Sequence, residues 1–414
     1  MGARDTADLV VVGAGTVGGW ASVFATEAGL RRVIVLERDV AGQGASSRAA
    51  GMVRSQGGTP DTVRLGSWSI EFYRAQAERY GTDSGFRGQG YVILASTVAD
   101  ERAARARIEM QRGMGSYSRW VDAAEARSLS PTLAETGYRG GSYVPTDGWL
   151  DPPRNVRAYS LAMQRAGVDL REGTAFTGLR TRARRGGRPV VTGVHTDVGT
   201  IATSRVLLTG GPSLPSVARA AGAKAWVGYA RHQVVVTERH RDLAPERFGA
   251  MVFDIRGGIY WRPEEGGLLW GMSNPREAPG PALSIDRSYV RTMQRRLGRL
   301  VPVTRELGIK KMWAATIEYT PDHLPLVGPL VLPGGASVEG AGIASACGHG
   351  MMWGPAVSRI AIDLLLRDAT DVIERAGDLR MDRFDERGRS PFVDPVALPF
   401  PVSVDEGRTN TPGR

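Results

Sequence analysis

The 414-residue sequence predicts a mixed α/β fold in two interleaved domains, one built on a parallel sheet and the other on an antiparallel sheet. Residues 8–13 (DLVVVG) form an unbroken apolar run, as in strands that are buried on both faces of a parallel sheet. Residues 226–274 instead consist of several short strand-like runs. Residues 337–368 repeat the order of strand, glycine-rich turn and helix with which the chain opens. We therefore expect the chain to leave the first domain and return to it.

The elements of the first half follow from hydrophobic spacing. After the first strand, residues 16–29 predict a helix and residues 32–37 predict a second parallel strand, which together complete a βαβ unit. Residues 62–80 and 99–110 have the spacing of amphipathic helices, and residues 90–96 (GYVILAS) predict a strand between them.

The later elements predict where the two domains divide. Residues 155–166 predict a helix, residues 190–208 a hairpin that returns to the first sheet, and residues 289–307 a long helix. This order predicts a discontinuous first domain of residues 1–90, 150–222 and 315–384, a second domain of residues 91–149 and 223–314, and a C-terminal tail of residues 385–414. The Pro, Gly and Arg content of the tail predicts a surface segment that is poorly ordered by its end.

Composition excludes several classes of protein. The formal net charge is +10, but the arginines are scattered among acidic residues without a long basic run, so no nucleic-acid partner is expected. Cys347 is the only cysteine, which excludes an intrachain disulfide and a cysteine-based metal cluster, and we expect no metal site. The chain begins without a secretory signal and has no run of about eighteen apolar residues. We expect a cytoplasmic protein without a membrane span.

One motif indicates a nucleotide. The residues Gly13, Ala14, Gly15, Thr16, Val17 and Gly18 form a GxGxxG sequence between a predicted strand and a predicted helix. Such glycines allow a tight turn and close approach of a pyrophosphate to the backbone. Glu37 ends the second strand, where its carboxylate can accept hydrogen bonds from a ribose hydroxyl. The pattern predicts a Rossmann-like dinucleotide site, which by itself fits NAD and FAD equally.

Later segments resemble a known family. Residues 44–51 (GASSRAAG), 206–212 (VLLTGGP), 313–328 (WAATIEYTPDHLPLVG) and 340–355 (GAGIASACGHGMMWGP) resemble, in this order, segments of the FAD-dependent D-amino-acid, glycine, sarcosine and dimethylglycine oxidases and dehydrogenases. The resemblance covers residues 8 to about 384 and is nearest to the β subunit of multi-subunit sarcosine oxidases and to the dimethylglycine and proline dehydrogenase branch. It implies an FAD-binding domain and a substrate domain. No histidine stands near Arg48, where dimethylglycine dehydrogenases hold the flavin covalently, so we expect noncovalent FAD.

The resemblance also implies which residues contact FAD. For Phe176, core packing is an equally good interpretation. Besides the GxGxxG residues and Glu37, the expected contacts are Arg38, Ala45, Ser46, Arg48, Ala49, Ala50, Gly51, Met52, Phe176, Thr209, Gly210, Gly211, Gly348, His349, Gly350 and Met351.

The activity that the resemblance implies is oxidation of a carbon–nitrogen bond in a small secondary amine or amino acid, with hydride transfer to flavin N5 and hydrolysis of the imine product. His349 is expected beside the flavin, in a positional role or as a general base. Tyr260 is expected to face substrate or to pack in the core. Glu318 could contact a cationic amine. Arg54 could bind a carboxylate, as could Arg231 and Arg262, with a structural salt bridge as the alternative for each.

The sequence departs from the family at two positions. Ile317 stands where D-amino-acid and glycine oxidases have a carboxylate-binding arginine, and Leu269 stands where monomeric sarcosine oxidase has a lysine that promotes reaction with oxygen. Substrate identity therefore stays open, with oxidation of a specialised-metabolite amine as an alternative, and so does the choice between O2 and another electron acceptor. Two rivals remain: an NAD-dependent dehydrogenase, and a flavin subunit that needs partner subunits. A homo-oligomer is also compatible with the sequence.

Overall fold

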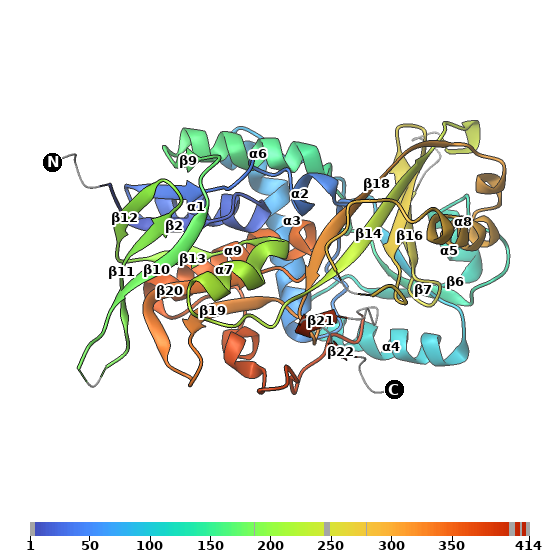
Figure 1. The fold of residues 1–414 in the computed structure, drawn as a ribbon. Helices are drawn as coiled ribbons and strands as arrows, with labels where there is room; N and C mark the ends of the chain where they lie inside the picture. The colour runs from blue at the N-terminus through green and yellow to red at the C-terminus, as the bar shows by residue number, and fades with distance from the viewer. Residues whose placement is uncertain are drawn as a thin grey trace.

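The computed structural model describes residues 5–185, 187–243, 249–278 and 280–396, together with the backbone of two short strands near the C-terminus. Two sheets organise the chain, and Figure 1 shows them side by side. We call them the first sheet and the second sheet. Each sheet is built from segments that are separated in the sequence, so the two domains interleave.

The first sheet has the strand order β1-β12-β11-β20-β13-β2-β3-β9, with β10 paired to β11 and β19 to β20. Its central strands are parallel, and the register places Val206 opposite Val10 and Leu9 opposite Val33. The strands are β1 (Thr6–Ala7), β2 (Leu9–Val12), β3 (Val33–Leu36), β9 (Asp169–Arg171), β10 (Phe176–Arg182), β11 (Val190–Thr196), β12 (Gly199–Thr203), β13 (Val206–Leu208), β19 (Leu326–Val331) and β20 (Ser337–Ser345).

Both faces of this sheet are covered, which is why β2 and β3 are continuous apolar runs. Leu9 and Val11 pack with the helices α1 and α9, whereas Val10 and Val12 pack into a separate core with the hairpin strands and α7. The helices around this sheet are α1 (Thr16–Glu27), α2 (Ala45–Arg48), α3 (Pro60–Tyr80), α6 (Pro152–Arg165), α7 (Leu214–Ala220) and α9 (Gly350–Arg367).

The second sheet is largely antiparallel, with the order β18-β14-β17-β16-β15-β5-β7-β6. Its core contains the fully buried aromatic side chains of Trp261, Trp270 and Tyr260. The elements are β5 (Tyr91–Ala95), α4 (Val98–Gly113), β6 (Arg119–Asp122), α5 (Ala123–Leu129), β7 (Gly140–Val144), β14 (Gly228–Thr237), β15 (Met251–Asp254), β16 (Ile259–Glu264), β17 (Gly267–Ser273), α8 (Arg287–Leu300) and β18 (Ile309–Tyr319). Two small ribbons, β4 (Met52–Val53) with β8 (Gly148–Trp149) and β21 (Val402–Asp405) with β22 (Arg408–Asn410), complete the fold.

The predicted mixed α/β fold with a parallel and a largely antiparallel sheet is confirmed, with three corrections. The helix predicted over residues 289–307 ends at Leu300, because Pro302 lacks the N–H that would continue it. The predicted domain boundary at residue 315 cuts through β18, which pairs with β14 as far as Tyr319 opposite Gly228. Residues 315–319 therefore belong to the second sheet.

The third correction concerns the predicted surface tail. Most residues from 385 to 395 lie at the surface, but Asp394 is only 2% exposed and Val396 only 1% exposed, so the segment packs against the body of the protein at these two residues. An apolar side chain and a sequestered carboxylate, not the overall polar composition, decide the position of this segment. The end of the tail, predicted to be poorly ordered, lies outside the described residues. Within the described part of the chain, no helix is long and apolar enough to cross a bilayer.

Candidate functional site

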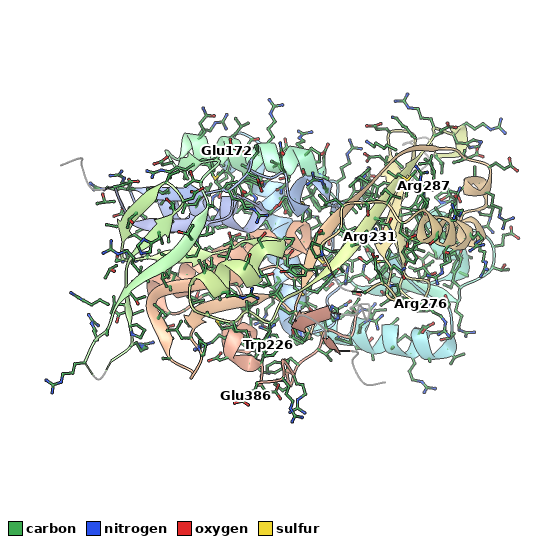
Figure 2. All side chains as sticks on the ribbon, in the orientation of Figure 1. Glu172, Trp226, Arg231, Arg276, Arg287 and Glu386 are labelled. Carbon is green, nitrogen blue, oxygen red and sulfur yellow. The ribbon has the colours of Figure 1, made fainter. Side chains whose placement is uncertain are left out.

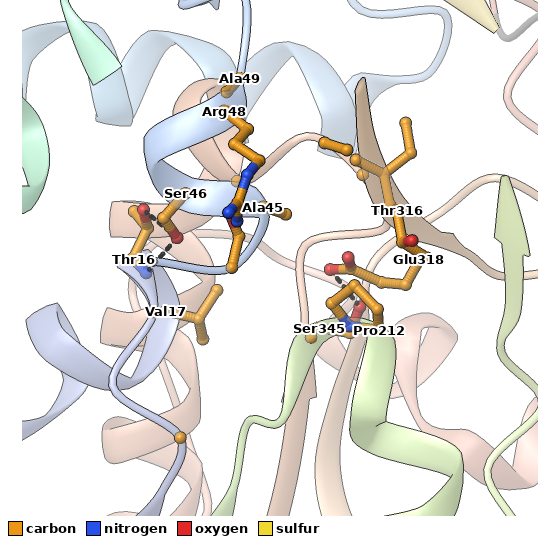
Figure 3. Close-up of a pocket in the computed structure, with 18 of the residues that line it drawn as sticks. Thr16, Val17, Ala45, Ser46, Arg48, Ala49, Pro212, Thr316, Glu318 and Ser345 are labelled. Carbon is orange, nitrogen blue, oxygen red and sulfur yellow. Dashed lines mark hydrogen bonds between the residues drawn. The ribbon is translucent and has the colours of Figure 1, made fainter. Parts of the chain in front are cut away.

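One large cavity of about 1140 Å³ lies between the two sheets. Its wall comes from the carboxyl ends of β2, β3 and β13, from α2, from the turn before α9, and from strands of the second sheet. Figure 3 shows Thr16, Ser46 and Arg48 on one side of this cavity and Glu318 and Ser345 on the other. The carboxyl ends of parallel strands are where open α/β sheets bind ligands. The cavity is therefore the candidate site.

The GxGxxG turn is shaped by contacts that only glycine permits. Gly13 has φ of +100°. A Cβ atom on Gly18 would lie 1.9 Å from the carbonyl oxygen of Gly13 and 2.6 Å from Oγ1 of Thr209. Thr209 Oγ1 donates a 2.8 Å hydrogen bond to the carbonyl oxygen of Val12. Gly18 thus lets α1 approach the strand ends closely, and the N-terminus of α1 faces the cavity, as a pyrophosphate site requires.

Glu37 lies beside this turn. One oxygen of its carboxylate accepts a hydrogen bond from the amide of Ala14 at 3.0 Å, and the other accepts from the amide of Asp39 at 3.1 Å. Glu37 also lines the cavity. The charge of Glu37 is therefore held at the position where the carboxylate of a dinucleotide site contacts ribose.

The small-residue loop is tied to both sheets. Ser46 Oγ accepts a 3.0 Å hydrogen bond from the amide of Thr16 at the start of α1 (Figure 3). On the other side, Trp313 Nε1 donates a 2.8 Å hydrogen bond to the carbonyl oxygen of Arg48. The Arg48 guanidinium donates to the carbonyl oxygens of Gln43 and Gly44 and so links the end of α2 to the residues that precede it. These contacts hold residues 44–52 as a wall of the cavity and leave small side chains toward its interior.

The turn before α9 is sharply bent. Cys347 and Gly348 have φ of +52° and +71°, and His349 Nδ1 lies 2.6 Å from the carbonyl oxygen of Cys347. The His349 ring packs against Trp353, with 4.2 Å between ring centroids. Burial, with a smaller contribution from the charge of Arg54, lowers the pKa of His349 to about 3. His349 is therefore neutral at physiological pH.

Glu318 lies at the end of β18, where it lines the cavity (Figure 3). Its carboxylate accepts a 3.3 Å hydrogen bond from Ser345 Oγ. Burial raises the pKa of Glu318, and the hydroxyl of Ser345 and the amide of Gly348 oppose that shift. Part of its hydrogen-bonding capacity is thus used within the protein, and the predicted contact with an amine remains a prediction.

Three of the five histidines line this one cavity: His232, His323 and His349. Burial lowers the pKa values of His232 and His323 to about 4. All three imidazoles are therefore uncharged above about pH 5. Sequence reasoning did not select His232, although a histidine within the apolar run of β14 was a detectable signal.

Tyr260 matches the second of its two predicted interpretations, packing in the core. It is fully buried and does not line the cavity, because it sits behind His232, whose Nε2 lies 2.6 Å from the Tyr260 hydroxyl. His232 Nδ1 lies 3.0 Å from Ser273 Oγ. Of the two interpretations, core packing therefore describes Tyr260, and any effect of Tyr260 on a bound molecule acts through His232.

The structure separates the three candidate arginines. Arg54 lines the cavity, is 4% exposed, donates to the carbonyl oxygen of Gln56 and makes no ion pair with a carboxylate of the described residues. Arg231 instead pairs with Glu277 on the side of the second domain, in the region of Arg276 and Arg287 (Figure 2). Arg262 pairs with Glu264 at 2.6 Å and belongs to a second cavity of about 670 Å³. Arg54 is the only one of the three whose charge faces the main cavity.

The cavity wall contains nearly all of the residues expected to contact a cofactor. The exceptions are Ala14 and Gly18, which belong to the GxGxxG turn but do not line the cavity. The expected residues on the wall are Gly13, Gly15, Thr16, Val17, Glu37, Arg38, Ala45, Ser46, Arg48, Ala49, Ala50, Gly51, Met52, Phe176, Thr209, Gly210, Gly211, Gly348, His349, Gly350 and Met351. Besides His232, the wall contains Tyr91, Tyr229, Phe253, Met272 and Val396, which sequence reasoning missed because their separate segments meet only in the folded chain.

Comparisons with known proteins agree with this geometry. The chain is 27% identical to 4-methylaminobutanoate oxidase (formaldehyde-forming) of Paenarthrobacter nicotinovorans over 325 residues, which are 76% of this chain and 38% of the relative. It is 26% identical to mitochondrial dimethylglycine dehydrogenase of Rattus norvegicus over 388 residues, which are 88% of this chain and 43% of that relative. This chain thus spans about two fifths of their lengths. Glycine oxidase of Geobacillus kaustophilus is 27% identical over 88% of this chain and 94% of its own.

Solved structures show the same fold. L-Proline dehydrogenase from P. horikoshii superposes with a TM-score of 0.84 at 24% identity, over 94% of this chain and 100% of that one. The family model described as DAO, FAD dependent oxidoreductase, matches residues 8–364. This match confirms FAD as the cofactor class and so contradicts the NAD-dependent rival, while the contacts of the dinucleotide motif with FAD stay a prediction. The chain therefore belongs to the DAO family of FAD-dependent oxidoreductases.

Proposed function

We propose that this chain holds FAD without a covalent bond and oxidises a carbon–nitrogen bond in a small amine or amino acid whose anionic group is bound by Arg54. One observation carries the proposal: a single cavity joins the GxGxxG turn to the buried Arg54, which pairs with no carboxylate among the residues that the structure describes. The relatives support the reaction class, since they include an oxidase of a methylamino acid and a dehydrogenase of dimethylglycine by name. When bound, FAD supplies the acceptor for hydride from the carbon next to nitrogen.

Arg54 provides the binding energy for an anion. A buried charge is costly unless it is paired, and an arginine can hold a carboxylate through two parallel hydrogen bonds. Asp147 and Asp394 influence Arg54 electrostatically from beyond ion-pair distance, so a substrate carboxylate would be its direct partner. Ile317, at the position of the arginine of D-amino-acid oxidases, also lines the cavity. Arg54 would thus replace that missing cation from a different element of the fold.

The three cavity histidines do not take up the proton of the amine. A protonated amine has no lone pair to assist cleavage of the neighbouring C–H bond, so it must lose its proton first. Imidazoles with pKa values of about 3 to 4 do not hold that proton at neutral pH. The positive charge of Arg54 disfavours a second cation in the same cavity and so lowers the pKa of a bound amine. Among the groups on the wall, Arg54 therefore favours the deprotonated amine, and the three imidazoles do not act as its base.

The proposal of noncovalent FAD rests on the loop at residues 44–52, which contains no histidine or cysteine, and on Cys347, which is fully buried and absent from the cavity wall. Acid denaturation followed by centrifugation tests it. Yellow colour released into the supernatant supports noncovalent binding, whereas colour that stays with the precipitated protein contradicts it.

The function is tested by an absorbance spectrum of the purified protein followed by anaerobic addition of secondary amines and amino acids. Bleaching of the flavin band by an amine that carries a carboxylate, and not by the matched amine without one, supports the proposal. Re-oxidation by air then separates an oxidase from a dehydrogenase. Yellow protein that no amine bleaches would contradict amine oxidation while leaving the family assignment intact.

A second candidate is a flavin subunit that passes electrons within a larger assembly. Two observations favour it. This chain spans about two fifths of the lengths of 4-methylaminobutanoate oxidase and dimethylglycine dehydrogenase, and hydrogen cyanide synthase subunit HcnC of Pseudomonas aeruginosa is 26% identical over 72% of this chain. Turnover of this chain alone with O2 or a soluble acceptor would exclude the requirement for partner subunits. Flavin bleaching without turnover would support it.

A further inference from the structure

Residues 385–396 bring a C-terminal segment into the wall of the main cavity. The family match ends at residue 364, so this segment lies outside the part of the chain that the family model describes. The segment begins near Trp226, and Figure 2 labels Glu386 and Trp226 on the same side of the molecule. Gly388 has φ of +74°, and a Cβ atom on it would lie 2.5 Å from the Trp226 ring. The segment ends at Val396, which lines the cavity.

Asp394 fixes the segment on two sides. Its amide donates a 3.0 Å hydrogen bond to the carbonyl oxygen of Asp322, and its Oδ1 accepts a 3.0 Å hydrogen bond from the amide of Val396. Asp322 is itself held by a buried ion pair with Arg383 at 2.7 Å. On the other side, Gly58 is so close that a Cβ atom there would lie 2.2 Å from Asp394 Oδ1. The segment is therefore fixed between the turn before His323 and the loop that follows Arg54.

The carboxylate of Asp394 also lies within the electrostatic influence of Arg54. Arg54 and Arg107 both act electrostatically on this buried carboxylate. Its Oδ2 makes no hydrogen bond to any described residue. Asp394 therefore connects the position of the segment to the charge of Arg54.

Val396 is the residue of this segment that lines the cavity. It is 1% exposed and packs in the core of the second sheet with Tyr91 and Tyr319, both of which also line the cavity. Val393, three residues earlier on the same segment, is 57% exposed and does not line the cavity. Only one of the two valines can therefore meet a molecule in the cavity.

We propose that Val396 and Asp394 form a specificity element, in which Val396 limits the length of the apolar part of an anionic amine substrate and Asp394 holds Val396 in place. This inference rests on the proposed function. An apolar wall that is contributed from outside the shared family region restricts the substrate to an amine whose anionic group meets Arg54 and whose apolar part is short. One methylene group in a hydrophobic pocket changes kcat/KM by roughly 10-fold or more.

The test compares Val396→Ala with the matched control Val393→Ala in the flavin-loaded full chain. The first measurement is the dissociation constants of acetate, butyrate and hexanoate, from the change that each causes in the flavin spectrum. The second is kcat/KM for N-methyl amino acids with side chains of increasing length. We expect Val396→Ala to favour longer ligands. Between neighbouring members of each series, the ratio of dissociation constants or of kcat/KM values should shift toward the longer member by about tenfold or more. Val393→Ala should leave both series unchanged.

A second substitution keeps the inference testable if Val396→Ala does not retain flavin. Val396→Ile adds one methylene group to the wall and should shift both series toward shorter ligands. An unchanged ratio in Val396→Ile, or a shift of equal size in Val393→Ala, would overturn the inference. Failure of the proposed function is distinguishable, because in that case the unaltered chain itself would neither be bleached by any amine nor bind any of the three carboxylates.

Discussion

His349 Nδ1 and the carbonyl oxygen of Cys347 are hydrogen-bonded across 2.6 Å. A carbonyl oxygen only accepts, so Nδ1 of His349 carries the proton and Nε2 holds the lone pair. The hydrogen bond closes the turn that precedes α9, and it makes the imidazole part of the backbone geometry of the site. Two roles for His349 can therefore be separated by a substitution that keeps this hydrogen bond.

The substitution His349→Asn keeps a side-chain N–H that can reach the Cys347 carbonyl oxygen. If the role of His349 is positional, FAD binding should be retained and kcat should fall by less than about tenfold, with an unchanged pH profile. Loss of a general base typically lowers rates by about 10²- to 10⁴-fold. Measurement of kcat in both proteins decides between the roles, and a loss in that larger range with FAD binding retained would identify His349 as the base.

The substitution Arg54→Met should remove the anion site. Truncation of a buried charged partner typically costs about 2–5 kcal/mol, so the KM for a carboxylated amine should rise by roughly 30-fold or more. The KM for the matched amine without a carboxylate should rise much less. Arg291→Met, an exposed arginine on α8, is the control and should leave both values unchanged. Equal losses for the charged and uncharged amines would show that Arg54 does not bind the anion.

Gly18→Ala should weaken FAD binding. The added Cβ would lie 1.9 Å from the Gly13 carbonyl oxygen, so α1 must move away from the strand ends. Such overpacking costs about 1–3 kcal/mol, which corresponds to a dissociation constant for FAD raised by roughly 5- to 150-fold. Gly113→Ala, where an added Cβ meets no atom within 4 Å, should not change it. Fluorescence titration of the apoprotein measures both, and equal affinities would mean that the turn does not carry the cofactor.

The rate of flavin reduction should rise with pH through the pKa of the bound amine. The three cavity histidines have lowered pKa values of about 3 to 4, so they charge only below about pH 5 and contribute no step at higher pH. Anaerobic stopped-flow reduction at saturating substrate from pH 6 to 10 measures this dependence. The apparent pKa should move upward in Arg54→Met, because removal of a nearby positive charge makes a protonated amine more favourable. A flat profile would exclude amine deprotonation from the observed step.

Local sequence was sufficient for the first sheet and for the cofactor turn. The GxGxxG motif and Glu37 predict a dinucleotide site from residues of a single βαβ unit. Strand burial, the glycine turn and the start of α1 all depend on residues that are adjacent in the chain. The family match confirms the FAD assignment that the later segments implied. The residue-level contacts with FAD stay predictions, although their shared position on one cavity wall supports them.

The substrate end of the cavity was less accessible to sequence reasoning. For Tyr260 the sequence left two interpretations, facing substrate or packing in the core, and cross-strand register places it behind His232, 28 positions earlier in the chain. Side chains on a sheet alternate between faces, so a pattern within one strand does not reveal which neighbour covers it. Val396 was assigned to a surface tail because composition describes the average of a segment. The burial of Val396 depends instead on its own packing in the core of the second sheet.

The sequence by itself determined the fold class, the dinucleotide turn and the membership of an FAD-dependent family, since these depend on short segments whose residues act together in the chain. Only the tertiary structure decided which arginine faces the cavity, which histidines surround it and which part of the C-terminal segment closes it. These relationships join residues separated by tens to hundreds of positions, and they exist only after both sheets have packed against each other.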